Sequence, residues 1–122
     1  MLNRIYNLPE LNFIGGDTKR IRFTLHTPVG EDFDASKCEL GFAIINYANR
    51  NGIPAVLKKD IPLEYGDSGV RNVVVVNLES DDTKLLYGKY IYQLTIKYNN
   101  ETDIPGQGIM NITRNIHTSF LN

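Results

Sequence analysis

The stretch GKYIYQLTIKY, residues Gly88–Tyr98, decides the fold class of this protein. Its side chains alternate along the whole segment between an apolar, aromatic set and a more polar set. The first set consists of Tyr90, Tyr92, Leu94, Ile96 and Tyr98. Successive side chains of a strand point to opposite faces, so this period of two predicts a half-buried β-strand with the aromatic set in the core.

Other segments repeat the pattern on a shorter scale. Arg20–His26 alternates charged or polar residues with apolar ones, and Cys38–Tyr47 places Leu40, Phe42 and Ile44 on one parity. Asn72–Leu78 contains four consecutive valines, whose branched side chains favour a strand. Further strands are expected at Leu11–Ile14, at the edge segment Ala55–Lys59 and at Gly106–Ile116, with a polar hairpin loop at Asn99–Asp103.

One helix start signal interrupts these strands. Ser80 or Asp81 can cap a short segment that extends to Leu86, with carboxylates at the positive end of the helix dipole. The pattern as a whole predicts an all-β, antiparallel β-sandwich of about seven to nine strands with one short helical turn. We expect a single domain over residues 11–122, preceded at residues 1–10 by an arm or lead-in strand.

Composition excludes several classes of protein. The 122 residues include 13 Lys+Arg, 14 Asp+Glu and one cysteine, Cys38, so neither an internal disulfide framework nor a four-cysteine zinc site is possible. The formal net charge of −1 argues against a nucleic-acid partner. The sequence has no apolar run long enough to span a membrane and no signal-peptide pattern at its start, so no membrane partner is expected.

The sequence offers little for catalysis or for a cofactor. Gly66-Asp67-Ser68-Gly69 looks like the nucleophile loop of trypsin-like serine proteases, but that mechanism needs a histidine bonded to the serine. The two histidines are His26, on an expected strand, and His117, near the end of the chain. We interpret the motif as a turn and predict no catalytic residue, no cofactor and no enzyme activity.

Acidic residues leave a calcium site open as an alternative. Glu31, Asp32 and Asp34 form an acidic loop that either is simply solvated or holds a calcium ion together with Asp17, or with Asp81 and Asp82. None of these residues has the spacing of a known calcium loop. We therefore predict no metal ligand.

Two surfaces are candidates for contact with partners. Ala43, Ile45 and Ile91 have the parity opposite to the core set, so they are expected to cluster on the outer face of one sheet. Such a face is either a protein interface or a group of ordinary exposed apolar residues. Four tyrosines near turns, Tyr6, Tyr47, Tyr65 and Tyr87, suggest an alternative, a carbohydrate- or receptor-binding module that uses loops at one end of the sandwich.

Two stretches together resemble a known family. The first runs from Gly16-Asp17-Thr18 to Ala43-Ile44 and includes a Gly-Asp start, an alternating strand and an Asp-x-Ser step at residues 34–36. The second is Leu86–Leu94, followed by Gly106-Gln107-Gly108. Both resemble the immunoglobulin-like N-terminal domain of phage baseplate upper proteins.

The resemblance implies both a fold and a function. The fold is immunoglobulin-like, with Tyr90 as the structural tyrosine of a tyrosine corner whose hydroxyl bonds to the backbone near Asp81–Lys84. The function implied is that of a structural or adaptor protein of a phage or prophage particle. Its partners would be copies of itself, as a homo-oligomer, or other tail and baseplate proteins. It would be a virion component, assembled in the bacterial host cytoplasm.

Overall fold

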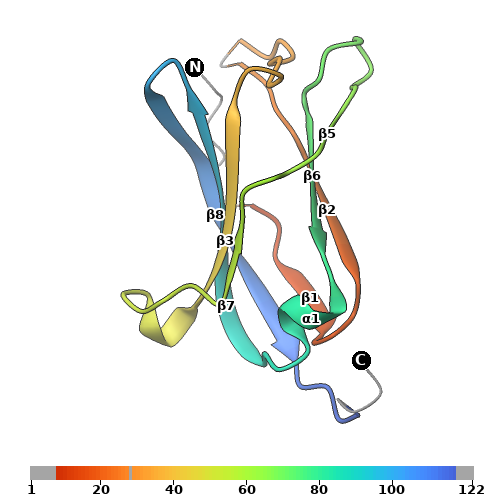
Figure 1. Ribbon diagram of the computed structural model, residues 1–122, viewed down its shortest axis with the longest axis vertical. Coiled ribbons are helices and arrows are strands. Elements are labelled where there is room, and N and C mark those ends of the chain that lie inside the picture. The colour runs from red at the N-terminus through yellow and green to blue at the C-terminus, as the bar shows by residue number, and fades with distance from the viewer. Residues whose placement is uncertain (1–7, 28, 118–122) are drawn as a thin grey trace.

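The computed structural model describes residues 8–27 and 29–117, which form two packed β-sheets (Figure 1). The five-stranded sheet has the order β1-β8-β7-β3-β4, and the three-stranded sheet has the order β2-β6-β5. The strands are β1 (Leu11–Ile14), β2 (Lys19–Thr24), β3 (Glu39–Asn46), β4 (Val56–Lys58), β5 (Leu63–Glu64), β6 (Val73–Leu78), β7 (Gly88–Tyr98) and β8 (Glu101–Thr113). The all-β, sandwich-like fold expected from the sequence is therefore confirmed.

The core lies between the two sheets, where the period-two pattern placed it. Tyr92, Leu94 and Ile96 of β7 are all buried, and so are the Leu40, Phe42 and Ile44 side chains of β3. At its centre the rings of Phe23, Phe42 and Tyr92 meet with centroids 6.0–6.4 Å apart. These rings join β2 of one sheet to β3 and β7 of the other, and so hold the two layers together.

The pairing of β1 departs from the antiparallel arrangement we expected. β1 pairs with β8 in parallel, from Leu11 opposite Met110 to Ile14 opposite Thr113. Both strands run toward the end of the sandwich that carries the short helix α1 (Ser80–Thr83) (Figure 1). The chain then crosses to the other sheet at Gly15, where a Cβ atom would lie 2.6 Å from the Thr83 carbonyl oxygen. The remaining strand pairs are antiparallel.

The hairpin between β7 and β8 is tighter than predicted. Its turn is Asn99–Asn100, with φ angles of 50° and 65°, and β8 already begins at Glu101. A two-residue turn with positive φ at both positions matches the twist of the flanking strands, and asparagine tolerates that conformation. The loop expected over Asn99–Asp103 is therefore mostly strand.

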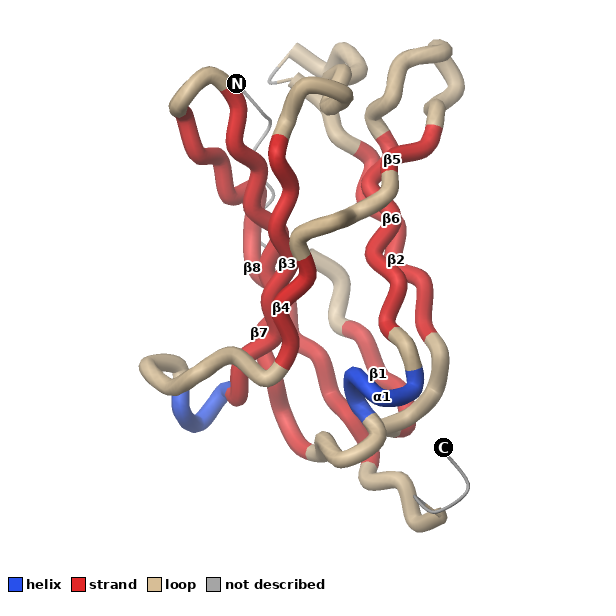
Figure 2. Tube along the Cα trace, in the orientation of Figure 1, coloured by secondary structure: helices blue, strands red, loops and turns tan. Residues whose placement is uncertain are grey.

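Residues 8–27 and 29–117 contain two short helical segments where one was expected (Figure 2). α1 (Ser80–Thr83) is capped by Glu79, whose backbone N–H bonds to the Asp82 carboxylate at 2.7 Å, so the predicted caps Ser80 and Asp81 were wrong. The second segment is the 3-10 turn η1 (Tyr47–Asn49), which begins at the predicted end of β3. In residues 8–27 and 29–117, neither helix has the length or the apolar character to cross a membrane.

The lead-in to the sandwich is only partly visible. Residues 1–7 of the expected N-terminal arm lie outside the described residues. Leu8 already contacts the five-stranded sheet, because its N–H bonds to the Gln107 carbonyl oxygen at 3.4 Å.

Candidate functional site

The outer face of the five-stranded sheet carries the three residues predicted as an interface. Ile45 of β3 lies directly opposite Ile91 of β7, and Ala43 lies in the next row, opposite Gln93. Their neighbours in sequence, Phe42 and Ile44, are buried, so Ala43 and Ile45 face away from the core. The sequence pattern therefore placed these three side chains on the same face.

The structure adds two apolar residues that the sequence analysis did not identify. Ile109 of β8 lies opposite Ile91 on the side away from Ile45, so three isoleucines form one row across β3, β7 and β8. Leu57 of β4 lies opposite Ala43 and is 63% exposed. Ile109 and Leu57 are next in sequence to the buried residues Met110 and Val56, so they face outward. This alternation was the signal in the sequence that could have identified them.

The row changes the role of Ile91. Although it faces outward, Ile91 is only 9% exposed, because isoleucines flank it on both sides. A partner could therefore gain little from contact with Ile91 itself. The accessible apolar surface belongs to Leu57 and to the half-buried Ala43, Ile45 and Ile109.

Polar groups frame this apolar row. At one end, the ring of Tyr47 in η1 lies between two cations, with the Lys89 Nζ atom 4.1 Å and the Arg50 Cζ atom 4.3 Å from its centroid. On the other side, Gln107 donates to the Gln93 side-chain oxygen at 2.7 Å. The outer face therefore combines a narrow apolar centre with amide and cationic groups around it.

The predicted tyrosine corner is not found at Tyr90. Tyr90 is buried, but among the described residues its hydroxyl makes no hydrogen bond to Asp81–Lys84. The tyrosine hydroxyl that bonds to the backbone is that of Tyr92, which donates to the Pro9 carbonyl oxygen at 2.6 Å. Tyr92 therefore links the core to the chain segment that precedes β1.

Tyr92 fits because of a glycine on the neighbouring strand. It lies opposite Gly108, where a Cβ atom would be 2.4–2.6 Å from two ring carbons and the hydroxyl oxygen of the tyrosine. Burial raises the pKa of the Tyr92 phenol to about 12. The hydroxyl thus remains a hydrogen-bond donor at neutral pH.

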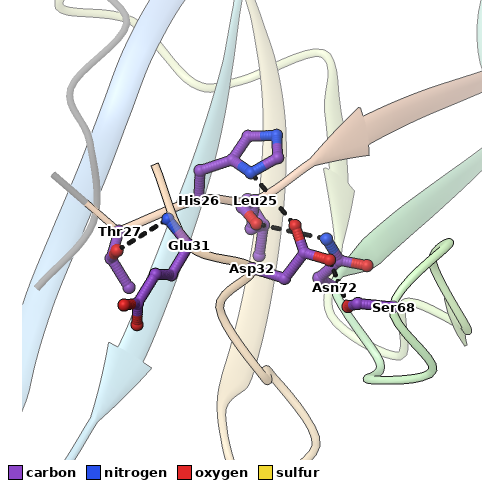
Figure 3. Close-up of polar contacts among 7 residues, drawn as sticks. All are labelled: Leu25, His26, Thr27, Glu31, Asp32, Ser68 and Asn72. Atoms are coloured by element: carbon purple, nitrogen blue, oxygen red, sulfur yellow. Dashed lines mark hydrogen bonds and ion pairs between the residues drawn. The ribbon is translucent and has the colours of Figure 1, made fainter. Parts of the chain in front are cut away.

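One residue of the protease-like motif, Ser68, lies close to Asp32 and His26 (Figure 3). The Ser68 hydroxyl bonds to the Asp32 carboxylate, and the His26 Nδ1 atom lies 3.3 Å from the other oxygen of that carboxylate. The sequence analysis did not anticipate this meeting, since Ser68 and Asp32 are 36 residues apart.

The order of these three groups differs from that of a catalytic triad. Here the carboxylate lies between serine and histidine, whereas nucleophilic catalysis needs the imidazole against the hydroxyl. The Asp32 carboxylate in the middle accepts a hydrogen bond from the Ser68 hydroxyl, and the hydroxyl keeps its proton. The arrangement suits a polar clamp that joins the loop after β2 to the loop after β5.

The acidic residues of the calcium alternative do not converge. Asp32 is in the clamp, and Asp34 instead bonds to Ser36, whose hydroxyl lies 2.7 Å from it and lowers the pKa of the carboxyl group. Asp82 of α1 pairs with Lys58 at 2.8 Å. Within the described ranges, no group of three or more metal-ligating side chains comes together.

Comparisons with known proteins add no family. No protein-family model matches the chain, and no curated protein matches it.

Proposed function

We propose that this chain is a non-enzymatic structural or adaptor protein of a phage or prophage particle. It acts by docking the outer face of its five-stranded sheet onto copies of itself, or onto other tail or baseplate proteins. The observation that carries the proposal is the exposed apolar surface of Leu57 beside the isoleucine row of β3, β7 and β8. The virion setting rests on the resemblance of the sequence to phage baseplate upper proteins.

The size of this face supports a protein partner. A strand of 11 residues, the length of β7, extends about 35 Å, and five strands side by side cover about 20 Å. Because β1, β3 and β4 are shorter than β7, the face measures roughly 600 Å², at the lower end of the ~600–1,000 Å² that each partner contributes to a standard interface. Its two-fold pairing with a second copy would bring apolar row against apolar row.

The experiment is the solution mass of the purified protein and of a double variant, Ile45→Lys with Leu57→Lys. We expect light scattering to show a defined oligomer for the wild type and a monomer for the variant, with the same circular dichroism spectrum. Ile53→Lys is the matched control, because Ile53 is 93% exposed in the loop after η1, away from the sheet. A wild-type monomer, or an oligomer that persists in the double variant, would refute the self-docking proposal.

The alternative, a glycan- or receptor-binding module, gains less support. It depends on tyrosines gathered at one end of the sandwich. Tyr47 and Tyr87 lie at the end where β3 finishes and β7 begins, whereas Tyr65 follows β5 at the opposite end (Figure 1). The aromatic side chains are thus divided between the two ends.

A further inference from the structure

The three-stranded sheet has a free edge at β2. In the described part of the chain, β2 pairs only with β6. Val75 of β6 donates its N–H to Pro62 on the β5 side at 3.0 Å, so its neighbours Val74 and Val76 bond toward β2. Leu25 confirms this register, because its N–H bonds to the Asn72 carbonyl oxygen at 2.8 Å.

The alternation of an antiparallel ladder fixes which groups of β2 remain unpaired. Ile21 and Phe23, opposite Val76 and Val74, bond to β6. The N–H and C=O groups of Arg20, Arg22 and Thr24 therefore point away from β6. None of them bonds to another backbone group among the described residues. This edge presents a template on which a further strand can form hydrogen bonds.

A groove lies beside this edge, between the two sheets. It consists of two adjoining hollows of about 320 and 170 Å³, which share Pro9, Arg22 and Phe23 as walls. Apolar residues supply most of the lining: Leu8, Pro9, Leu11, Phe13, Ile21, Phe23, Leu25, Tyr92, Leu94 and Pro105. The bond from Tyr92 to Pro9 fixes one wall, so the groove is formed before any partner binds.

Cations outnumber carboxylates around the groove, although Lys19 pairs with Asp17 at 3.3 Å. The charged residues that line it are Lys19, Arg20 and Arg22, and no carboxylate lines it. Arg20 and Arg22 are held on the outer face of the sheet, where Arg20 bonds to Asn77 at 3.1 Å and Arg22 pairs with Glu64. An added strand would direct alternate side chains into the groove and toward these two arginines.

From this arrangement we propose that β2 binds an extended segment of another polypeptide by strand addition. The segment alternates apolar side chains, which enter the groove, with acidic side chains, which meet Arg20 and Arg22. Backbone hydrogen bonds to residues 20, 22 and 24 provide the attachment, and the apolar groove and the arginines provide the selectivity. The site is on the sheet opposite the proposed docking face and does not depend on that function.

Other occupants fit the groove less well. The chain's own first seven residues contain Arg4 and no acidic residue, so they lack the charge that this edge would select. Single-stranded nucleic acid would meet the cations but would leave the outward N–H and C=O groups of β2 without a matching ladder. Basic residues on an edge strand also prevent unwanted pairing, and that role is the competing explanation.

The test uses a fluorescent peptide in which valine alternates with glutamate over the length of β2. We expect fluorescence polarisation to show binding, and at least about tenfold weaker binding when lysine replaces glutamate. Two peptides are N-methylated on alternate nitrogens, one on the valines and one on the glutamates, and the one whose methyl groups face β2 should not bind. No binding of the valine–glutamate peptide, or tighter binding of oligothymidine, would overturn the proposal.

Two variants of one residue separate backbone pairing from charge. Arg22→Pro removes the N–H that faces the free edge and retains the bonds between β2 and β6. Arg22→Ala removes the same cation and retains the N–H. We expect about a tenfold loss of affinity for the proline variant, and about a two- to threefold loss for the alanine variant. Equal losses would overturn strand addition.

Folding is checked for each variant by its thermal unfolding curve. If Arg22→Pro does not fold, Thr24→Pro and Thr24→Ala give the same comparison at the next outward position. Amide exchange in the free protein provides an independent measurement. The N–H groups of Arg20, Arg22 and Thr24 should exchange faster than those of Ile21 and Phe23, and equally slow exchange would show that the edge is already covered.

Discussion

Replacing Tyr92 with phenylalanine removes a single oxygen atom from the core. In the native structure this oxygen donates a hydrogen bond of 2.6 Å to the Pro9 carbonyl. A hydrogen bond contributes about 0.5–1.5 kcal/mol net to stability. Pro9 is exposed, so water can replace the lost donor at its carbonyl oxygen. We therefore expect Tyr92→Phe to lower the free energy of unfolding by about 1 kcal/mol.

Tyr90→Phe is the matched control for this prediction. Tyr90 has the same parity on β7 and is also buried, but its hydroxyl makes no hydrogen bond to Asp81–Lys84. We expect Tyr90→Phe to lower the free energy of unfolding by less than about 0.5 kcal/mol in urea titrations followed by circular dichroism. A cost for Tyr90→Phe equal to or larger than that for Tyr92→Phe would refute the reasoning and restore the tyrosine corner at Tyr90.

Wild type and Tyr92→Phe should also differ in how their stability depends on pH. Burial raises the pKa of Tyr92 from its ordinary value near 10 to about 12 in the folded protein. Because the folded pKa is the higher one, its stabilising contribution is complete below pH 10 and is lost as pH rises toward 12. Wild type should therefore lose more stability than Tyr92→Phe over this range. Parallel curves for the two proteins would contradict a raised pKa.

Three further experiments test the packing at Gly108, the turn at Asn100 and the row around Ile91. Gly108→Ala should lower the free energy of unfolding by about 1–3 kcal/mol in urea titrations, because its methyl group would overlap the buried Tyr92 side chain. The double variant Gly108→Ala with Tyr92→Leu should recover part of that free energy. Asn100→Gly should raise the free energy of unfolding by about 0.5 kcal/mol, and with it the melting temperature, because glycine adopts the φ of 65° at residue 100 without strain. A lower melting temperature would contradict the positive φ of this turn. Ile91→Lys should destabilise the protein more than Ile45→Lys in thermal melts, because Ile91 is only 9% exposed between its neighbours.

Local sequence patterns predicted the strands well because burial on one face imposes a period of two. β7 coincides with the segment Gly88–Tyr98, and its side chains Tyr90, Tyr92, Leu94 and Ile96 are buried as expected, whereas Tyr98 at the end of the strand is 41% exposed. The edge strand near Val56 was also predicted. Each of these features depends on residues that are close together in the chain.

Features that depend on distant parts of the chain were missed. The parallel pairing of β1 with β8 and the meeting of Ser68 with Asp32 follow from topology, which local periodicity does not encode. The sequence placed Ala43, Ile45 and Ile91 on one face but did not show the full row, because the register that brings Ile109 beside Ile91 was unknown. For the same reason the sequence did not identify Tyr92 as the bonded tyrosine, since its acceptor is 83 residues away.

The parallel contact of β1 with β8 has a mechanical consequence. β1 enters this contact at the end of the sandwich near Leu8, and β8 leaves it at the opposite end, beyond Thr113. Tension applied through residues 8 and 117 would slide the two strands past each other and would strain all four residue pairs, Leu11 to Ile14, together. A hairpin pulled open from one end breaks its bonds one after another. The domain is therefore built to resist stretching along the direction in which its chain passes through it.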